Sequence, residues 1–204
     1  MPAAILPLGR ETASKAAAVV RAGGLVVYPT DTVYGLGCDP FNSGAVRRLF
    51  EAKGRGAKAV PVLCGSLTKA AELVELNAVA LGLAGEHWPG PLTIVAPVKA
   101  KVPPQLTQGT GNLGVRVPGL VGCVELIDSC GGWLTGTSAN LSGRPSSRTA
   151  SDAVSQLGGA VDLIIDGGAL EGKESTVVQV VGEAVTILRT GPVGVGGQVK
   201  GPRT

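Results

Sequence analysis

Aromatic rings and histidine are the scarcest side chains in this sequence. Its 204 residues include only 2 Trp, 2 Tyr, 2 Phe and 1 His. So few rings argue against the stacking platform on which proteins bind single-stranded nucleic acid. The single histidine, His87, excludes a histidine-rich metal site and a two-histidine relay, and leaves one candidate for a Ser-His-Asp triad. We expect His87, beside Trp88 near a helix end, to be structural.

Cysteine and charge are also limited. The four cysteines form no C-x-x-C pair, which argues against a zinc ribbon, and they are too few and too widely spaced for a secreted disulfide framework. There is no apolar run of ~18 residues and no basic-then-apolar leader, so we expect a cytoplasmic protein without a membrane segment. A net charge of +3, from 18 basic and 15 acidic residues, does not by itself indicate a nucleic-acid binder.

Glycine is abundant instead, at 32 residues, without the three-residue period of collagen. A hydrophobic content of 44% with 16% charged residues is typical of a globular domain. Predicted helices alternate with predicted strands, which favours an α/β fold whose sheet mixes parallel and antiparallel strands. The predicted helices are 12–21, 43–53, 68–75, 77–87, 121–129 and 151–157, with Ser43 as the cap of the second. The predicted strands are 25–28, 60–64, 92–97, 114–117, 133–136, 161–165, 175–180 and 185–188.

Two glycine-containing segments resemble nucleotide-binding motifs, but their surrounding sequence does not match those motifs. Gly109, Gly111 and Gly114 match G-x-G-x-x-G, but a loop precedes them and an extended segment follows, whereas a dinucleotide site needs a strand and then a helix. The segment after Gly167 nearly forms a phosphate-binding P-loop. Glu174 stands there where Ser or Thr should hold magnesium, so we reject that interpretation.

Four segments place polar side chains and glycine at the ends of apolar strands or helices, where ligands bind in α/β proteins. The first segment, 28–37, is explained equally well by a capped turn. The second, Lys53-Gly54-Arg55, is explained equally well by favourable charge at a helix end. In the third, 113–118, the arginine Arg116 lies in an apolar strand and needs an anionic partner, either a structural carboxylate or a ligand. The fourth, 135–143, has more hydroxyl and amide groups than one turn needs.

Taken together, these segments resemble the YrdC family of threonylcarbamoyl-AMP synthases from about residue 12 to 193. The matching motifs, in the family's order, are YPTDTVYGLG (28–37), Lys-x-Arg (53–55), WPGPLT (88–93), VRVP (115–118), SANLSG (138–143), STV (175–177) and LRTGP (188–192). Each motif is weak alone, but seven in order are specific. The resemblance implies a YrdC-like twisted sheet with helices on both faces and a concave central site.

The resemblance also implies a reaction. L-threonine, bicarbonate and ATP would give threonylcarbamoyl-adenylate and pyrophosphate, with Mg²⁺ accompanying ATP. A separate transferase complex would pass the product to tRNAs that read ANN codons. The catalytic domain would span 1–190, and 191–204 would be a Gly/Pro-rich tail or linker remnant, able to act as a flap over the site.

Site residues follow from the same resemblance. Lys53 and Arg55 would be catalytic and hold the ATP phosphates. The wider ATP-binding set would be Lys53, Arg55, Asn112, Asn140, Arg148 and Arg189. The threonine-binding set would be Thr32, Cys64, Arg116, Ser138 and Ser175, with Thr30 as a further lining residue. The expected close approach of backbone amides to anionic oxygens would involve Gly35, Gly37, Gly54, Gly114, Gly136 and Gly143.

The chain departs from the family pattern at Gly56, Ala59, Cys64, Asn112 and Arg148, which puts the affinity for ATP and threonine in doubt. One alternative is a non-catalytic module that binds structured RNA, such as tRNA or double-stranded RNA. Another is a carbamoyltransferase of hydrogenase maturation, which would carry an acylphosphatase-like region and zinc segments that this sequence does not contain.

Overall fold

The computed structural model describes residues 3–54, 56 and 58–196. The strands formed within them are β1 (Ala4–Pro7), β2 (Val26–Tyr28), β3 (Gly35–Gly37), β4 (Val62–Cys64), β5 (Leu92–Pro97), β6 (Asn112–Arg116), β7 (Trp133–Thr135), β8 (Thr137–Ser138), β9 (Leu163–Asp166), β10 (Thr176–Val181) and β11 (Ala184–Arg189). The helices are α1 (Arg10–Arg21), α2 (Ser43–Lys53), α3 (Leu67–Leu73), α4 (Ala78–His87), α5 (Pro104–Thr107), α6 (Val121–Ser129) and α7 (Ala150–Leu157).

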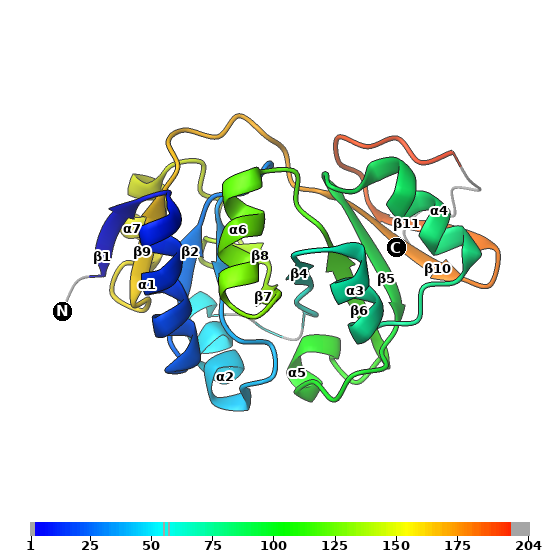
Figure 1. Ribbon diagram of the computed structural model, residues 1–204, viewed down its shortest axis with the longest axis horizontal. Helices are drawn as coiled ribbons and strands as arrows, with labels where there is room; N and C mark the ends of the chain where they lie inside the picture. The colour runs from blue at the N-terminus through cyan, green and yellow to red at the C-terminus, as the bar shows by residue number, and fades with distance from the viewer. Residues whose placement is uncertain (1–2, 55, 57, 197–204) are drawn as a thin grey trace.

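These strands form two sheets, which lie toward opposite ends of the molecule (Figure 1). The first has the order β1-β9-β2-β3-β8 and the second the order β11-β10-β5-β6-β4-β7. Both sheets mix parallel pairs, such as β1 with β9 and β5 with β10, and antiparallel pairs, such as β2 with β3 and β10 with β11. The predicted α/β class with mixed pairing is confirmed, and its strands divide between two sheets.

The chain passes from one sheet to the other at Gly136. This residue alone separates β7, in the second sheet, from β8, in the first. A Cβ atom at Gly136 would lie 2.6 Å from Cγ of Leu63, so the crossing leaves no room for a side chain. The strand predicted at 133–136 thus corresponds to β7 and Gly136, and β8, in the other sheet, is a further strand that was not predicted.

Tyr28 explains the glycines of the neighbouring strand β3. A Cβ atom at Gly35 would lie 2.9 Å from Cζ of the Tyr28 ring, and one at Gly37 would lie 2.7 Å from its Cε1. The two positions share one face because side chains alternate along a strand. The ring is fully buried, and its hydroxyl donates to the Thr135 carbonyl at 2.8 Å. Gly37 therefore makes room for core packing, not for a ligand.

Local sequence determines where the helices begin and end. Helix α2 has the predicted bounds, but Asn42, not Ser43, caps it by accepting from the Ala45 amide at 3.0 Å. Gly54 ends the helix in the left-handed conformation at φ 53°, which glycine adopts without strain. In α7, Thr149 and Asp152 form a complete capping box.

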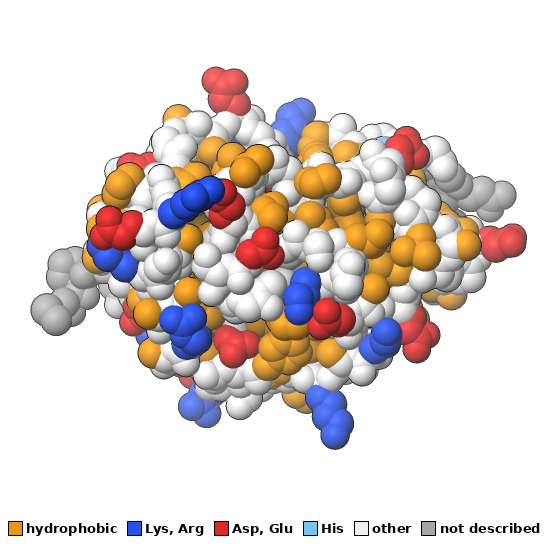
Figure 2. All heavy atoms as spheres, in the orientation of Figure 1, with side chains coloured by type: hydrophobic (Ala, Val, Ile, Leu, Met, Phe, Trp, Pro, Cys, Tyr) orange, Lys and Arg blue, Asp and Glu red, His pale blue; other side chains and the backbone are white. Residues whose placement is uncertain are grey.

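Helices cover both sheets (Figure 1). Helices α1 and α6 lie side by side in front of the first sheet and enclose a core that includes Tyr28, Leu126 and Leu134. A larger core packs beneath α2, α5 and α7, and a third includes α4 with β5 and β10. On the face shown in Figure 2, acidic and basic side chains are interspersed, and hydrophobic side chains gather around α4. None of the helices in the described ranges could cross a membrane, being too short or too polar.

The predicted Gly/Pro-rich tail is ordered along the part that the structure describes, up to residue 196. The Thr176 hydroxyl donates to the Val193 carbonyl at 2.8 Å, and the Gly191 amide donates to that hydroxyl at 3.1 Å. Val195 is buried in the core around α4. This stretch packs on β10 and α4 and is absent from the lining of the central cavity, whereas residues 197–204 lie outside the described part.

Substituting alanine for Gly37 should destabilise the fold. The added methyl group would overlap the Tyr28 ring and Leu134, neither of which can move into open space. We expect the free energy of unfolding, measured by urea denaturation, to fall by about 2–3 kcal/mol.

Gly82→Ala is the matched control. Gly82 lies inside α4, and a Cβ atom there would meet no atom within 4 Å. The same methyl group should raise stability by about 0.5–1 kcal/mol through helix propensity. Equal effects of the two substitutions would contradict the packing role of Gly37.

Candidate functional site

A cavity of about 590 Å³ opens between the two sheets. Its walls come from both of them, with Gly35 and Ser138 on one side and Thr93, Gly114 and Arg189 on the other. The volume is in the range of pockets that hold small organic ligands. The predicted site residues that line this cavity are Thr32, Lys53, Asn112, Arg116, Ser138, Asn140, Ser175 and Arg189, together with Thr30.

The charges around the cavity are strongly unequal. The cationic lining residues are Lys53, Lys58, Arg116, Arg144 and Arg189. Among the described lining residues, Glu174 is the only acid. A concave surface of this kind concentrates positive potential and favours an anionic ligand, such as a carboxylate or a phosphate.

Arg116 is the most constrained of these cations. It ends β6 and is almost fully buried, with 5% of its side chain exposed. Its Nε donates to the Gly90 carbonyl at 2.9 Å, and one terminal nitrogen donates to the Thr32 hydroxyl at 3.1 Å. The other terminal nitrogen pairs with the Asp31 carboxylate at 2.5 Å. Of the two partners considered for this arginine, the structural carboxylate is therefore present.

These contacts leave Arg116 able to bind a ligand. A guanidinium carries five N–H donors, and the three contacts use one donor each. Burial lowers the pKa of Arg116, and the charge of Asp31 opposes that shift. Because the guanidinium faces the cavity and has unused donors, it can bind a second carboxylate beside that of Asp31.

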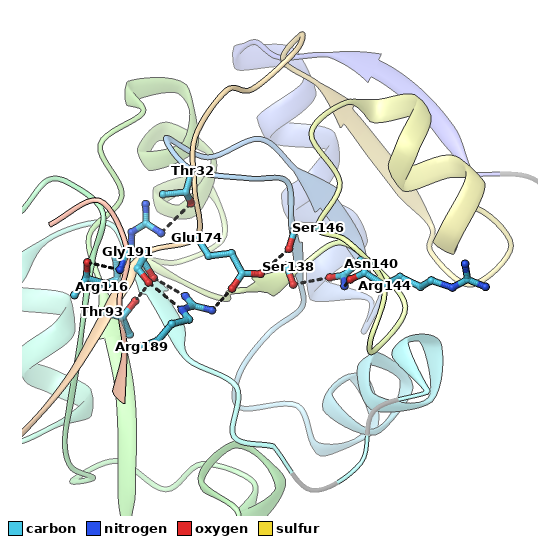
Figure 3. Close-up of polar contacts among 12 residues, drawn as sticks. Thr32, Thr93, Arg116, Ser138, Asn140, Arg144, Ser146, Glu174, Arg189 and Gly191 are labelled. Atoms are coloured by element: carbon cyan, nitrogen blue, oxygen red, sulfur yellow. Dashed lines mark hydrogen bonds and ion pairs between the residues drawn. The ribbon is translucent and has the colours of Figure 1, made fainter. Parts of the chain in front are cut away.

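The two threonines before β3 form a hydrogen-bonded turn. The Thr32 amide donates to the Thr30 hydroxyl at 3.0 Å, and that hydroxyl donates to the Val33 carbonyl at 2.7 Å. The two hydroxyl oxygens lie 2.9 Å apart. A capped turn is thus present, and it also directs Thr32 toward Arg116, as Figure 3 shows.

Lys53 connects the end of α2 to the segment after β8. It is 2% exposed, and its ammonium group donates to the carbonyl oxygens of Ser138 and Asn140, the latter at 2.7 Å. The Ser138 hydroxyl donates to the Asn140 side-chain oxygen at 2.5 Å, and the Asn140 amide donates to the Arg144 carbonyl at 2.6 Å (Figure 3). In this arrangement Lys53 shapes the Ser-x-Asn segment at the cavity wall.

Arg189 contributes a second polar cluster at the end of β11. Its Nε donates to the Ser175 carbonyl and a terminal nitrogen to the Ser175 hydroxyl, both at 3.0 Å. The Ser175 hydroxyl in turn lies 2.9 Å from that of Thr93. Arg189 also pairs with Glu174, which accepts from the Ser146 hydroxyl.

Two of the predicted site residues lie away from the cavity lining, and a third is not described. Arg55 lies outside the described residues. Cys64 is buried and absent from the cavity lining, and burial raises the pKa of its thiol to about 12. Arg148 is exposed and absent from the lining as well, and its backbone amide donates to Asp152 at the start of α7. Cys64 alternates with cavity-lining Leu63 along β4, so its side chain faces the core.

The polar lining residues that sequence reasoning missed include Thr93, Arg144 and Glu174, together with Lys58, Thr110 and Gln179. Thr93 and Arg144 lie in or next to two of the quoted motifs, so their position was a usable signal. Glu174 was considered only as a failed P-loop residue. Of the six glycines expected near a ligand, Gly35, Gly114, Gly136 and Gly143 line the cavity. His87 is not among the lining residues, and its ring nitrogen lies 3.6 Å from Glu86.

Within the described residues, no group of three or more His, Cys, Asp or Glu side chains could hold a metal ion. Any cation in the cavity would find Glu174 as its one carboxylate among the described lining residues. Such a set suits Mg²⁺ that arrives with phosphates, because that ion keeps several waters and needs few protein ligands.

Comparison with known proteins gives a consistent result. The Sua5, YciO and YrdC family model, described as telomere recombination, matches residues 18–191. A threonylcarbamoyl-AMP synthase of Pyrococcus abyssi is 38% identical over 179 residues, which cover 86% of this chain and 53% of that protein. One of Idiomarina loihiensis is 39% identical over 153 residues, which cover 72% of this chain and 82% of that protein.

Solved structures agree with the sequences. Pyrococcus abyssi Sua5 complexed with L-threonine has a TM-score of 0.88 at 36% identity, covering 92% of this chain and 57% of that one. Escherichia coli YciO also has a TM-score of 0.88, at 26% identity, covering 95% of this chain and 98% of that one. The chain thus spans about half the length of the Pyrococcus relatives and nearly all of YciO.

Neutralising Asp31 should destabilise the protein, because the charge of buried Arg116 would lose its carboxylate partner. Breaking a buried ion pair leaves an uncompensated charge, and the 18% exposure of the Asp31 side chain places the loss at the low end for such pairs. We expect Asp31→Asn to lower the free energy of unfolding by about 2–3 kcal/mol in urea titrations.

Glu51→Gln provides the control, since it breaks the exposed Arg47–Glu51 pair within α2. Its expected effect is below about 0.5 kcal/mol. If the two substitutions cost the same, Asp31 does not compensate the buried charge.

Proposed function

Because the chain belongs to the Sua5, YciO and YrdC family, we propose that it is a threonylcarbamoyl-AMP synthase. It would form threonylcarbamoyl-adenylate and pyrophosphate from L-threonine, bicarbonate and ATP, and so be a nucleotidyltransferase. The observation that carries the proposal is the single cavity that gathers a buried arginine, a Ser-x-Asn segment and Arg189 from separate parts of the chain. We further infer that the catalytic domain extends to about residue 190.

The chemistry suits a site without a strong base. The amine of threonine attacks the carbon of bicarbonate, water leaves, and a carbamate anion forms. A carbamate oxygen then attacks the α-phosphorus of ATP, and the bond to the β-phosphate oxygen breaks to release pyrophosphate. The nucleophile is already anionic at the second step, so the protein has to position two anions and stabilise charge.

We assign threonine to the Arg116 end of the cavity. The spare donors of Arg116 would hold the threonine carboxylate, while Asp31 and Gly90 keep the guanidinium oriented. Thr32 and Ser175 would contribute hydroxyl groups, and Ser138 would lie where threonine meets the nucleotide. The crystal structure of Pyrococcus abyssi Sua5 complexed with L-threonine is consistent with a threonine site in this fold.

We assign ATP to the other cations. Arg189 and Lys53, with Arg55, would lie along the phosphates, and Asn112 and Asn140 would contact the nucleotide. The cavity-lining residues fit Mg²⁺ bound chiefly through those phosphates. Lys53 would act in part by holding the Ser138–Asn140 segment in place. The exposed position of Arg148 gives it a role only at the outer edge of the nucleotide.

The product would leave for a threonylcarbamoyl transferase complex acting on tRNA, and we place the enzyme in the cytoplasm, where these substrates occur. An RNA-binding module is favoured by no observation of the structure. The face shown in Figure 2 has no continuous basic surface, and most of the described cations around the cavity are held by backbone or side-chain groups.

Purified protein should release pyrophosphate from ATP only when threonine and bicarbonate are both present. Omission of either one should abolish the signal in a coupled pyrophosphate assay. Lys53→Ala should lower kcat/KM by about 30-fold, equivalent to ~2 kcal/mol of transition-state stabilisation. ATP hydrolysis that ignores threonine, in protein that is folded by circular dichroism, would rule out the proposed reaction.

Arg116→Lys should separate the two substrates. Lysine keeps the positive charge but loses the planar pair of donors that fits a carboxylate. We expect the KM for threonine to rise about 10- to 100-fold while the KM for ATP changes less than about threefold. A parallel rise in both constants would contradict the assignment of Arg116 to threonine.

A further inference from the structure

Glu174 occupies an unusual place for an acidic residue. It lines a cavity whose other charged lining residues, within the described part of the chain, are cations. One carboxylate oxygen pairs with Arg189, and the other accepts from the Ser146 hydroxyl at 2.5 Å. Figure 3 shows Glu174 between these two partners, of which Arg189 ends β11 and Ser146 lies in the loop between β8 and α7. A carboxylate here fills the position that an anionic ligand group would take beside Arg189.

The backbone that presents Glu174 is firmly held. Residues 167–175, which we call the crossing segment, run from β9 to β10 along the top of the molecule in Figure 1. The Tyr34 hydroxyl donates to the Gly168 carbonyl at 2.7 Å, and the Leu170 amide donates to the Arg148 carbonyl at 2.9 Å. A Cβ atom at Gly172 would lie 2.4 Å from the Thr32 carbonyl oxygen. Any displacement of Glu174 would therefore come from rotation of its side chain.

The two arginine–carboxylate pairs of the cavity differ in exposure. The Arg116–Asp31 side chains are 5% and 18% exposed, whereas those of Arg189 and Glu174 are 44% and 37% exposed. A buried pair is costly to break, but an exposed pair contributes little and exchanges readily. The first pair is suited to a permanent role, and the second is suited to being opened by a competing anion.

We propose that the Glu174 carboxylate holds the anion position beside Arg189 until a phosphate group of the ligand displaces it, and that it thereby lowers the affinity for phosphate-bearing ligands. This inference rests on the proposed function, because it takes the ligand at Arg189 to be a nucleotide. Displacement frees the Arg189 donors for that phosphate. Ligands without a strong anionic group leave the Glu174–Arg189 pair closed, so Glu174 affects the affinity only of ligands that carry such a group.

Calorimetric titration of the full chain with ATP and with adenosine, in buffer containing EDTA, tests the proposal. Glu174→Gln keeps the shape of the side chain and removes the competing charge. Its Kd for ATP should fall roughly two- to fivefold, as expected for an exposed ion pair, and its Kd for adenosine should not change. Ser146→Ala removes only the hydroxyl that holds Glu174, and it should tighten ATP binding by a smaller factor.

Glu171→Gln is the matched control for charge. Glu171 lies on the same segment, is exposed and does not line the cavity. The proposal is overturned if Glu174→Gln binds ATP no more tightly than wild type, or if Glu171→Gln gives the same gain. Threonine-dependent pyrophosphate release by wild-type protein separates that failure from failure of the proposed function. If neither ATP nor inorganic pyrophosphate binds wild type or Glu174→Gln, both proposals fall.

Discussion

The burial of one guanidinium group organises this molecule. Arg116 cannot leave water without partners, because an unpaired buried charge costs several kcal/mol even after the protein relaxes. Its partners come from the turn before β3, which supplies Asp31 and Thr32, and from the Gly90 carbonyl before β5. The first segment leads into β3 of the first sheet and the second into β5 of the second sheet. The contacts of this one charged group therefore join the two sheets at the cavity. Structural and binding demands meet in this one side chain.

The local elements were largely predictable from the sequence. Helices 43–53 and 121–129 and strand 92–97 have the predicted bounds, since their periodicity and end signals lie within the segment itself. The strands β1, β3 and β8 and the short helix α5 were missed. Strand β3 contains two glycines, a residue type that disfavours strands. Larger residues would not fit there, because a Cβ atom at either position would overlap the Tyr28 ring. Long-range demands of this kind leave little trace in a local window.

Similar limits apply to the site. The motifs identified most of the lining residues, because polar groups at strand ends are visible in sequence. The partner of Arg116 was left open between a carboxylate and a ligand, and only the fold brings Asp31 next to it. Cys64 was assigned to the threonine site through the family resemblance, at a position where the chain departs from the family pattern, yet the strand period directs it into the core. The contact between Glu174 and Ser146, 28 residues apart, depends on the path of the crossing segment.

The one-residue passage between the sheets at Gly136 has a consequence for how the cavity could be reshaped. Two domains joined by a flexible linker can change their separation, but here a single residue joins strand β7 of one sheet to strand β8 of the other. This connection ties the two sheets together at the cavity wall, where Gly136 is a lining residue. Widening the cavity would therefore depend more on shortening wall side chains such as Val95 or Val177 than on loosening the backbone.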